Sequence, residues 1–193
     1  MKNYLNHNKE LKTMKKLKIV MLVTVLMILS ACGGKTIEMN YYKIDGIEYM
    51  FPIKYKKVVI MCDDKHHYYR LDKNNAIRFQ IIDNEVDIVN EKTGYSHMET
   101  VMDLSYTNLG YQKKEFRSYR RINNPGGRSE YVNPQKKKAG LLSYGLYVHT
   151  DRIILISYEY ENGINEEYCD EYELILSEID VPVFEYDKEI KNT

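Results

Sequence analysis

An apolar run near the N-terminus decides which part of the chain is available to fold. The run covers residues 19–29, follows a lysine-rich flank, and leads into Ser30, Ala31 and Cys32. A membrane-spanning helix needs about 20 apolar residues, so a run of this length is too short to be one. A basic flank, a short apolar run and small residues beside a cut site are typical of a processing segment. The folded body is therefore expected among the 162 residues after Ala31.

The end of this run resembles the lipobox of bacterial lipoproteins, through Leu29, Ser30, Ala31 and Cys32. The resemblance implies that residues 1–31 are a signal peptide and that Cys32, acylated on its sulfur, becomes the first residue of the mature protein. One acyl chain anchors a protein only marginally, and lipoproteins of this family carry a diacylglycerol. The implied location is extracytoplasmic, on a cell membrane or an outer membrane, with the lipid on Cys32 making the membrane a partner.

Two alternatives for the leader stay open. An ordinary secretory signal cut after Ala31 would leave Cys32 as a free thiol. A start at Met14 would give the leader Met-Lys-Lys-Leu-Lys, which is more usual than the longer one from Met1. In either case residues 32–40 are expected to be a short tether, 41–182 a single domain and 183–193 a tail.

Charge is unevenly placed in the expected mature chain, which has 22 basic and 27 acidic residues. Nine basic residues fall within 113–138, and twelve acidic residues fall within 159–193. A basic patch could lie against anionic headgroups, but mutual neutralisation or simple solvation of the two segments is the favoured interpretation. An exported acidic domain is a poor partner for nucleic acid.

Tyrosine supplies most of the aromatic bulk, because the mature chain has eighteen tyrosines, four phenylalanines and no tryptophan. A phenol hydroxyl needs water or a partner, so the composition predicts sheet faces that are half exposed. A tyrosine-rich surface that binds sugars or peptides is the second interpretation, since tyrosine is in any case favoured in strands.

The pattern of apolar residues predicts an α+β domain with an antiparallel sheet. Expected strands cover 41–51 with a turn at Asp45-Gly46, and 58–62, 67–71, 76–82, 86–89, 140–148 and 152–160. Segment 113–122 is ambiguous between strand and loop. Segment 123–134, with its Pro-Gly-Gly sequence, is expected to be irregular.

Two helices are predicted to pack on this sheet. Ser96 and Glu99 form a capping box for a central helix over 97–109, with Gly110 after its end. Asn165 caps a C-terminal helix that stops before Pro182. The expected buried faces are Met98, Val101, Met102, Ser105 and Leu109 in the first helix, and Tyr168, Tyr172, Ile175, Leu176 and Ile179 in the second.

The order of these elements resembles the PsbP-like fold of extrinsic photosynthetic proteins and various bacterial lipoproteins. The segments that carry the resemblance are the opening strand 47–52, the hairpin 144–160 and the closing helix 172–181. The resemblance implies helices on both sides of an antiparallel sheet, and it transfers no functional residue.

The densest group of ligand-type side chains runs from Cys62 to His67. Asp64 and His66 could share a face and are the weak metal candidates, but adjacent strand residues point to opposite faces and no metal-ligand spacing is present. An ordinary polar turn is preferred, and neither a metal nor another cofactor is expected. Cys62 and Cys169 could form a disulfide in an oxidising compartment, or both could stay reduced.

No catalytic set is recognisable, because the chain lacks a Gly-x-Ser-x-Gly elbow and its cysteines have no evident histidine context. Two isolated histidines remain as candidates, His97 and His149. Two carboxylate pairs, Glu159 with Glu161 and Asp170 with Glu173, occur on faces that are expected to be solvated. The Gly126-Gly127-Arg128 sequence could cradle an anion, but a flexible loop is the preferred interpretation.

The leading hypothesis is a non-enzymatic, lipid-anchored envelope protein that binds a partner, such as an envelope protein, or supports an assembly. The alternatives are an envelope hydrolase with a site built from scattered residues, and a ligand-binding accessory lipoprotein.

Overall fold

The computed structural model describes residues 37–88, 90–121 and 124–179, and the elements in them belong to one compact unit, Glu38–Thr193. The signal segment and Cys32 lie outside the described residues. In chain order the elements are β1 (Met39–Ile44), β2 (Ile47–Pro52), β3 (Lys56–Lys57), η1 (Val59–Met61), β4 (His66–Arg70), β5 (Asn75–Asp83), α2 (Glu91–Thr107), β6 (Gln112–Arg121), β7 (Asn124–Val132), β8 (Gly140–His149), β9 (Arg152–Tyr160) and α3 (Glu166–Ser177).

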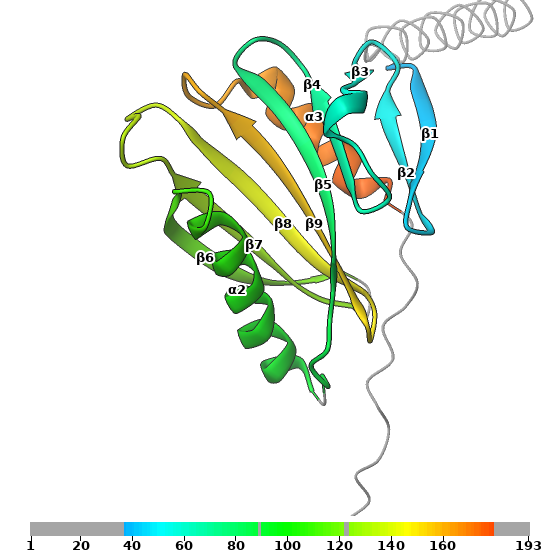
Figure 1. Ribbon diagram of the computed structural model, residues 1–193, viewed down its shortest axis with the longest axis vertical. Coiled ribbons are helices and arrows are strands. Elements are labelled where there is room, and N and C mark those ends of the chain that lie inside the picture. The colour runs from blue at the N-terminus through cyan, green and yellow to red at the C-terminus, as the bar shows by residue number, and fades with distance from the viewer. Residues whose placement is uncertain (1–36, 89, 122–123, 180–193) are drawn as a thin grey trace, which may run out of the picture. The chain divides into compact units, whose positions relative to one another are not determined.

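The strands form two antiparallel sheets (Figure 1). Strands β1 and β2 make a hairpin of their own, and the larger sheet has the order β3-β4-β5-β9-β8-β7-β6. Its centre is the β8–β9 hairpin, which pairs in one register from Gly140↔Tyr160 to Tyr147↔Ile153 and shifts register before His149↔Arg152. This confirms the hairpin predicted over 140–160.

Two apolar cores lie on opposite faces of the larger sheet, because successive strand residues point to opposite sides. Leu146, Ile154 and Ile156 face a core shared with α3 and the β1–β2 hairpin. Tyr147 and Ile153 face a second core shared with α2. The α+β class and the expected placement of helices on both sides of an antiparallel sheet are confirmed.

The first hairpin turns where the sequence predicts. Asp45 and Gly46 both have positive φ, at 45° and 86°. A two-residue type I′ hairpin turn requires positive φ at both positions. The register Ile44↔Ile47 then places Ile44, Ile47 and Tyr49 against the larger sheet.

Helix α2 begins six residues before the predicted start. Asn90, not Ser96, is its N-cap, and the Asn90 side chain accepts a hydrogen bond from Thr93 N at 3.0 Å. Of the predicted face, Met98 and Met102 are buried, but Tyr106 completes it and Leu109 is 54% exposed beyond the helix end. The earlier start is possible because Gly94 fits closely against Ile88 and Pro125.

Helix α3 confirms the second prediction. Asn165 caps it by accepting a hydrogen bond from Tyr168 N, and Glu166 and Glu167 occupy the first turn. The buried stripe Tyr172, Ile175, Leu176 and Ile179 packs on the sheet.

Strand β7 contradicts the prediction that 123–134 is irregular. Pro125 sits near the strand start and pairs only with β6, through Arg120, where a missing N–H is tolerated. A Cβ on Gly127 would lie 2.5 Å from the Phe116 ring, so glycine lets that ring cross the strand. The predicted glycine-arginine loop at 126–128 is therefore part of a sheet and forms no anion cradle.

Two predicted short strands are also wrong. Segment 58–62 holds η1, whose turn is closed by Cys62 N bonding to Val59 O at 3.1 Å. Segment 86–88 pairs with no strand because Asn84 satisfies the Val86 backbone, with Nδ2 donating to Val86 O at 2.8 Å and Oδ1 accepting from Val86 N at 3.3 Å. Val89 lies outside the described residues.

The tyrosines fill the cores, which contradicts the expectation of half-exposed faces. Seven of them are less than 2% exposed: Tyr49, Tyr69, Tyr106, Tyr131, Tyr147, Tyr158 and Tyr172. Their hydroxyls take partners inside the domain, for example Tyr158 with Asn75 at 2.7 Å and Tyr106 with Ser143 at 2.7 Å.

Candidate functional site

The two layers that cover the sheet leave part of each face open. Helix α2 packs over β6, β7 and β8, so the strands β4 and β5 are open on that face. Helix α3 and the first hairpin pack with β5, β8 and β9 on the other face, so part of β6 and β7 is open there. Each open area carries a hollow lined by polar side chains.

The hollow beside β4 and β5, here called the tyrosine hollow, has a volume of about 310 Å³. Its walls include two half-buried tyrosines, two cationic side chains and a carboxylate: Tyr68, Tyr111, Arg70, Lys73 and Glu159. Small-molecule sites span about 300–1,000 Å³ and are usually apolar. A mostly polar lining at this size suits a hydrophilic ligand.

An ion pair fixes the carboxylate of this hollow. Arg78 Nε donates to Glu159 Oε1 at 2.8 Å, and the two side chains are only 29% and 18% exposed. The Arg78 guanidinium also lies 5.3 Å from the centre of the Tyr68 ring, an attractive cation–π arrangement. Burial lowers the pKa of Arg78, but the Glu159 carboxylate outweighs this and raises it overall. The Arg78 guanidinium is therefore charged, and its hydrogen bond orients the Glu159 side chain.

The two tyrosines of the hollow remain neutral phenols. Burial, followed by the Glu159 carboxylate, raises the pKa of both Tyr68 and Tyr111. Each ring therefore offers an apolar face together with a hydroxyl that can donate or accept. The site can hold a polar ligand by stacking and hydrogen bonds, and it presents no nucleophile activated by a base.

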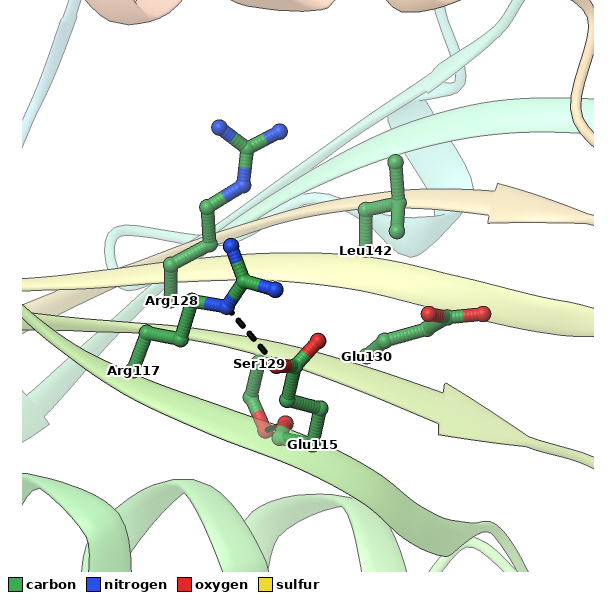
Figure 2. Close-up of a pocket in the computed structure, with 6 residues that line it drawn as sticks. All are labelled: Glu115, Arg117, Arg128, Ser129, Glu130 and Leu142. Carbon is green, nitrogen blue, oxygen red and sulfur yellow. Dashed lines mark hydrogen bonds and ion pairs between the residues drawn. The ribbon is translucent and has the colours of Figure 1, made fainter.

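The second hollow lies over β6, β7 and β8 and has a volume of about 370 Å³ (Figure 2). Arg117 and Arg128 are direct cross-strand partners on this open face. Like charges placed directly opposite each other destabilise a sheet. Each arginine is neutralised, Arg117 by Glu115 at 2.8 Å and Arg128 by Glu173 of α3.

The basic segment 113–138 is largely neutralised within the domain. Lys113 bonds to Glu99 and Asp103, both at 2.6 Å. Lys136 reaches Glu161 at 3.6 Å, so this pair and Arg128–Glu173 join the basic segment to the acidic one. Among described residues the segment thus presents few free cations, which favours the interpretation of mutual neutralisation.

The metal candidates of the sequence do not converge. His66 Nδ1 contacts Asp63 at 2.9 Å rather than Asp64, and the part of the chain that the structure describes holds no group of three His, Cys, Asp or Glu side chains fit for a metal. His67 is buried instead, with Nδ1 2.5 Å from the Tyr49 hydroxyl, which lies 2.6 Å from that of Tyr69. Burial, then Lys57, lowers the pKa of His67 to about 4.

The two cysteines are separate free thiols. Cys62 Sγ donates to Val58 O at 3.1 Å and accepts from Tyr68 N at 3.2 Å, which ties it to its own loop. Cys169 is half buried on α3 against the first core, and burial raises its pKa. The disulfide considered from sequence is not formed in this structure.

The other candidates also change role. Glu159, expected to be solvated, belongs to the half-buried pair with Arg78. His97 Nδ1 lies 2.8 Å from the Tyr147 hydroxyl and is not isolated. Asp170 and Glu161 are exposed, as expected. The side chain of His149 and the lipidation candidate Cys32 lie outside the described residues.

Comparison with known proteins shows a likeness to solved structures in fold alone. No protein-family model matches the chain, and no curated protein sequence does so. The structure is similar to the solution structure of cyanobacterial PsbP (CyanoP) from Synechocystis sp. PCC 6803, at 16% identity and a TM-score of 0.49, over 78% of this chain and 97% of that one. This likeness says nothing about what the chain binds.

No helix in the described ranges has the length and apolar character needed to cross a bilayer.

Proposed function

We propose that the protein is an extracytoplasmic lipoprotein whose domain binds a hydrophilic ligand in the tyrosine hollow without transforming it. The anchor rests on the sequence Leu29, Ser30, Ala31 and Cys32. Binding rests on one observation above all, the half-buried Arg78–Glu159 pair under an open polar hollow.

The Arg78–Glu159 pair supports binding because a half-buried ion pair often stabilises a sheet face less effectively than apolar packing would. Apolar residues of similar volume are often as stabilising as a desolvated ion pair, or more so. Arg78 instead holds the Glu159 carboxylate in one orientation. Glu159 lines the same hollow as Tyr68 and Tyr111. Fixed hydrogen-bonding groups between aromatic faces match the alternating C–H and O–H surfaces of a carbohydrate. A glycan is therefore the proposed class of ligand.

Catalysis is the weaker alternative. An envelope hydrolase needs a nucleophile within reach of a base. The histidines whose side chains are described bond elsewhere, His66 to Asp63, His67 to Tyr49 and His97 to Tyr147. An accessory lipoprotein that binds a ligand for a transporter is compatible with the same hollow.

The test is equilibrium binding of the purified protein to a panel of envelope glycans, by calorimetry or a glycan array. Glu159→Gln or Tyr111→Ala should weaken a bound glycan by about tenfold or more, because each removes a directed contact. Tyr41→Ala is the matched control, since Tyr41 lies on β1 and is 79% exposed. Equal losses in all three variants, or a glycan whose affinity none of them changes, would place the binding site elsewhere.

A further inference from the structure

Exposed apolar side chains gather on the elements that follow Cys32 most closely in the sequence. Tyr41 on β1 is 79% exposed, and Val59 and Met61 on η1 are 76% and 44% exposed. Scattered exposed apolar residues are normal, but two of these occupy one short turn. We call Tyr41, Val59 and Met61 the η1 patch.

Lysines border the η1 patch. Lys43 and Lys57 line one open hollow together with Val59, and Lys43 lies two residues from Tyr41, on the same face of β1. Lys43 pairs with Glu48 at 3.6 Å, whereas neither Lys56 nor Lys57 has an ion-pair partner within 4.0 Å among the described residues. Free cations beside an exposed apolar turn are complementary to an anionic lipid surface.

Acidic groups also lie near the patch. Asp45 lies 3.0 Å from the Arg152 guanidinium. Asp63 accepts from Lys65 N at 2.8 Å and contacts His66 at 2.9 Å, which lowers its pKa. Asp63 and Asp64 line the hollow without a lysine or arginine partner among the described residues, so the positive charge available to a lipid surface comes from Lys56 and Lys57.

The length of chain before β1 places the patch near a bilayer, provided that Cys32 is lipidated as proposed above. Strand β1 begins at Met39, and seven residues of chain span at most about 25 Å. The start of β1 therefore cannot lie further than that from the lipid-bearing residue.

We propose that the η1 patch docks on the anionic lipid surface to which the protein is anchored. Val59 and Met61 enter the boundary between headgroups and acyl chains, while Tyr41 and the lysines lie at headgroup level, where tyrosine and lysine are favoured. Docking would hold the anchored domain in one orientation, where a lipid alone leaves it free to turn on its tether.

The absence of tryptophan from the chain makes a direct test possible. Val59→Trp introduces a single reporter in the patch, and Leu104→Trp is the matched control, since Leu104 is 59% exposed on α2. Each variant is purified as the full lipidated protein, its lipid verified by mass, and reconstituted in phosphatidylcholine vesicles with or without phosphatidylglycerol. Quenching by brominated acyl chains is then measured.

Docking predicts blue-shifted, quenched emission for Val59→Trp in anionic vesicles and water-like emission for Leu104→Trp. Lys56→Gln or Lys57→Gln should each reduce the docking equilibrium by about fivefold in anionic vesicles. Unquenched Val59→Trp in protein that carries lipid and floats with the vesicles overturns the docking proposal alone. Protein without lipid overturns the proposed anchor, and docking with it.

Discussion

At the scale of residues, this core depends on polar groups that find partners away from water. The Tyr131 hydroxyl donates to Asp103 at 2.8 Å, and that of Tyr172 donates to the Ile156 carbonyl at 2.9 Å. A buried hydroxyl without a partner would cost free energy, so these bonds make a tyrosine-rich core possible. Composition alone predicts the opposite placement, because it cannot show which hydroxyls will meet an acceptor.

His67 gives the domain a pH dependence. Its pKa is about 4 in the folded protein and about 6.5 in an unfolded chain, so the unfolded state binds the proton more tightly. The stabilisation is complete above the unfolded pKa and is lost as pH falls toward the folded pKa. Between pH 7 and pH 4.5 the free energy of unfolding should drop by about 2 kcal/mol through this residue.

The measurement is urea unfolding at both pH values, with His67→Gln and His66→Gln compared. His67→Gln should remove this part of the pH dependence, because it removes the titrating group. His66→Gln, which changes a neighbour that is not buried, should leave it in place. The same pH dependence in His67→Gln as in the wild type would contradict the assignment.

The Arg78–Glu159 pair should also be visible in stability. Glu159→Gln leaves a half-buried guanidinium without its counter-ion, which should lower the free energy of unfolding by about 1–2 kcal/mol, less than for a fully buried pair. Glu161→Gln is the control, because the Lys136–Glu161 contact is exposed and such pairs contribute about 0–1 kcal/mol. Equal effects in urea unfolding would show that Arg78 does not depend on Glu159.

At the scale of elements, the two candidate caps of α2 can be separated. Asn90→Ala should destabilise the domain by about 1 kcal/mol, because the Asn90 side chain satisfies Thr93 N. Ser96→Ala should have little effect, since Ser96 is inside the helix. Thermal or urea unfolding of both variants checks this, and the reverse order of effects would restore the helix start predicted from sequence.

Gly127 should resist substitution although it lies in a strand, where alanine usually improves on glycine. A Cβ there would lie 2.5 Å from Phe116 Cε2 and 3.1 Å from Met98 Cγ. Gly127→Ala should cost about 1–3 kcal/mol. The cost should shrink in a Phe116→Leu background, and additive effects in urea unfolding would contradict this packing.

Local sequence signals predict some elements of this fold and not others. The β8–β9 hairpin and α3 follow from local signals, since alternation, turn residues and the Asn165 cap all lie within the element itself. Strand β7 does not, because the Pro-Gly-Gly sequence predicts a loop until the Phe116 ring is known to cross it. The sequence at Ser96 matches a capping box, but the helix already begins after Asn90, so Ser96 lies inside it.

At the scale of the whole molecule, the proposed binding site is assembled from distant parts of the chain. Tyr68, Arg78, Tyr111 and Glu159 come from β4, β5, the segment after α2 and β9. No local motif marks such a site, and it becomes visible only when the strand order β4-β5-β9 is known. The one available signal in the sequence is a charged residue, Arg78, inside a strand that is mostly apolar.

The fold also alters where unpaired charge lies on the molecule. In the sequence, segments 113–138 and 159–193 suggest a dipole, but the fold joins them through Arg128–Glu173 and Lys136–Glu161. Lys56 and Lys57, which have no ion-pair partner among the described residues, lie beside η1. A membrane-facing surface is therefore expected near the first hairpin and not along β6.

The proposed location of the protein depends on lipidation of Cys32, and labelling with a fatty acid in growing cells tests this most directly. The wild-type protein should incorporate the label and stay with the membrane fraction, whereas Cys32→Ala should lose the label and be released or mislocalised. Labelling that persists in Cys32→Ala, or an unlabelled wild-type protein, would contradict the lipid anchor from which the proposed envelope function and the docking surface both follow.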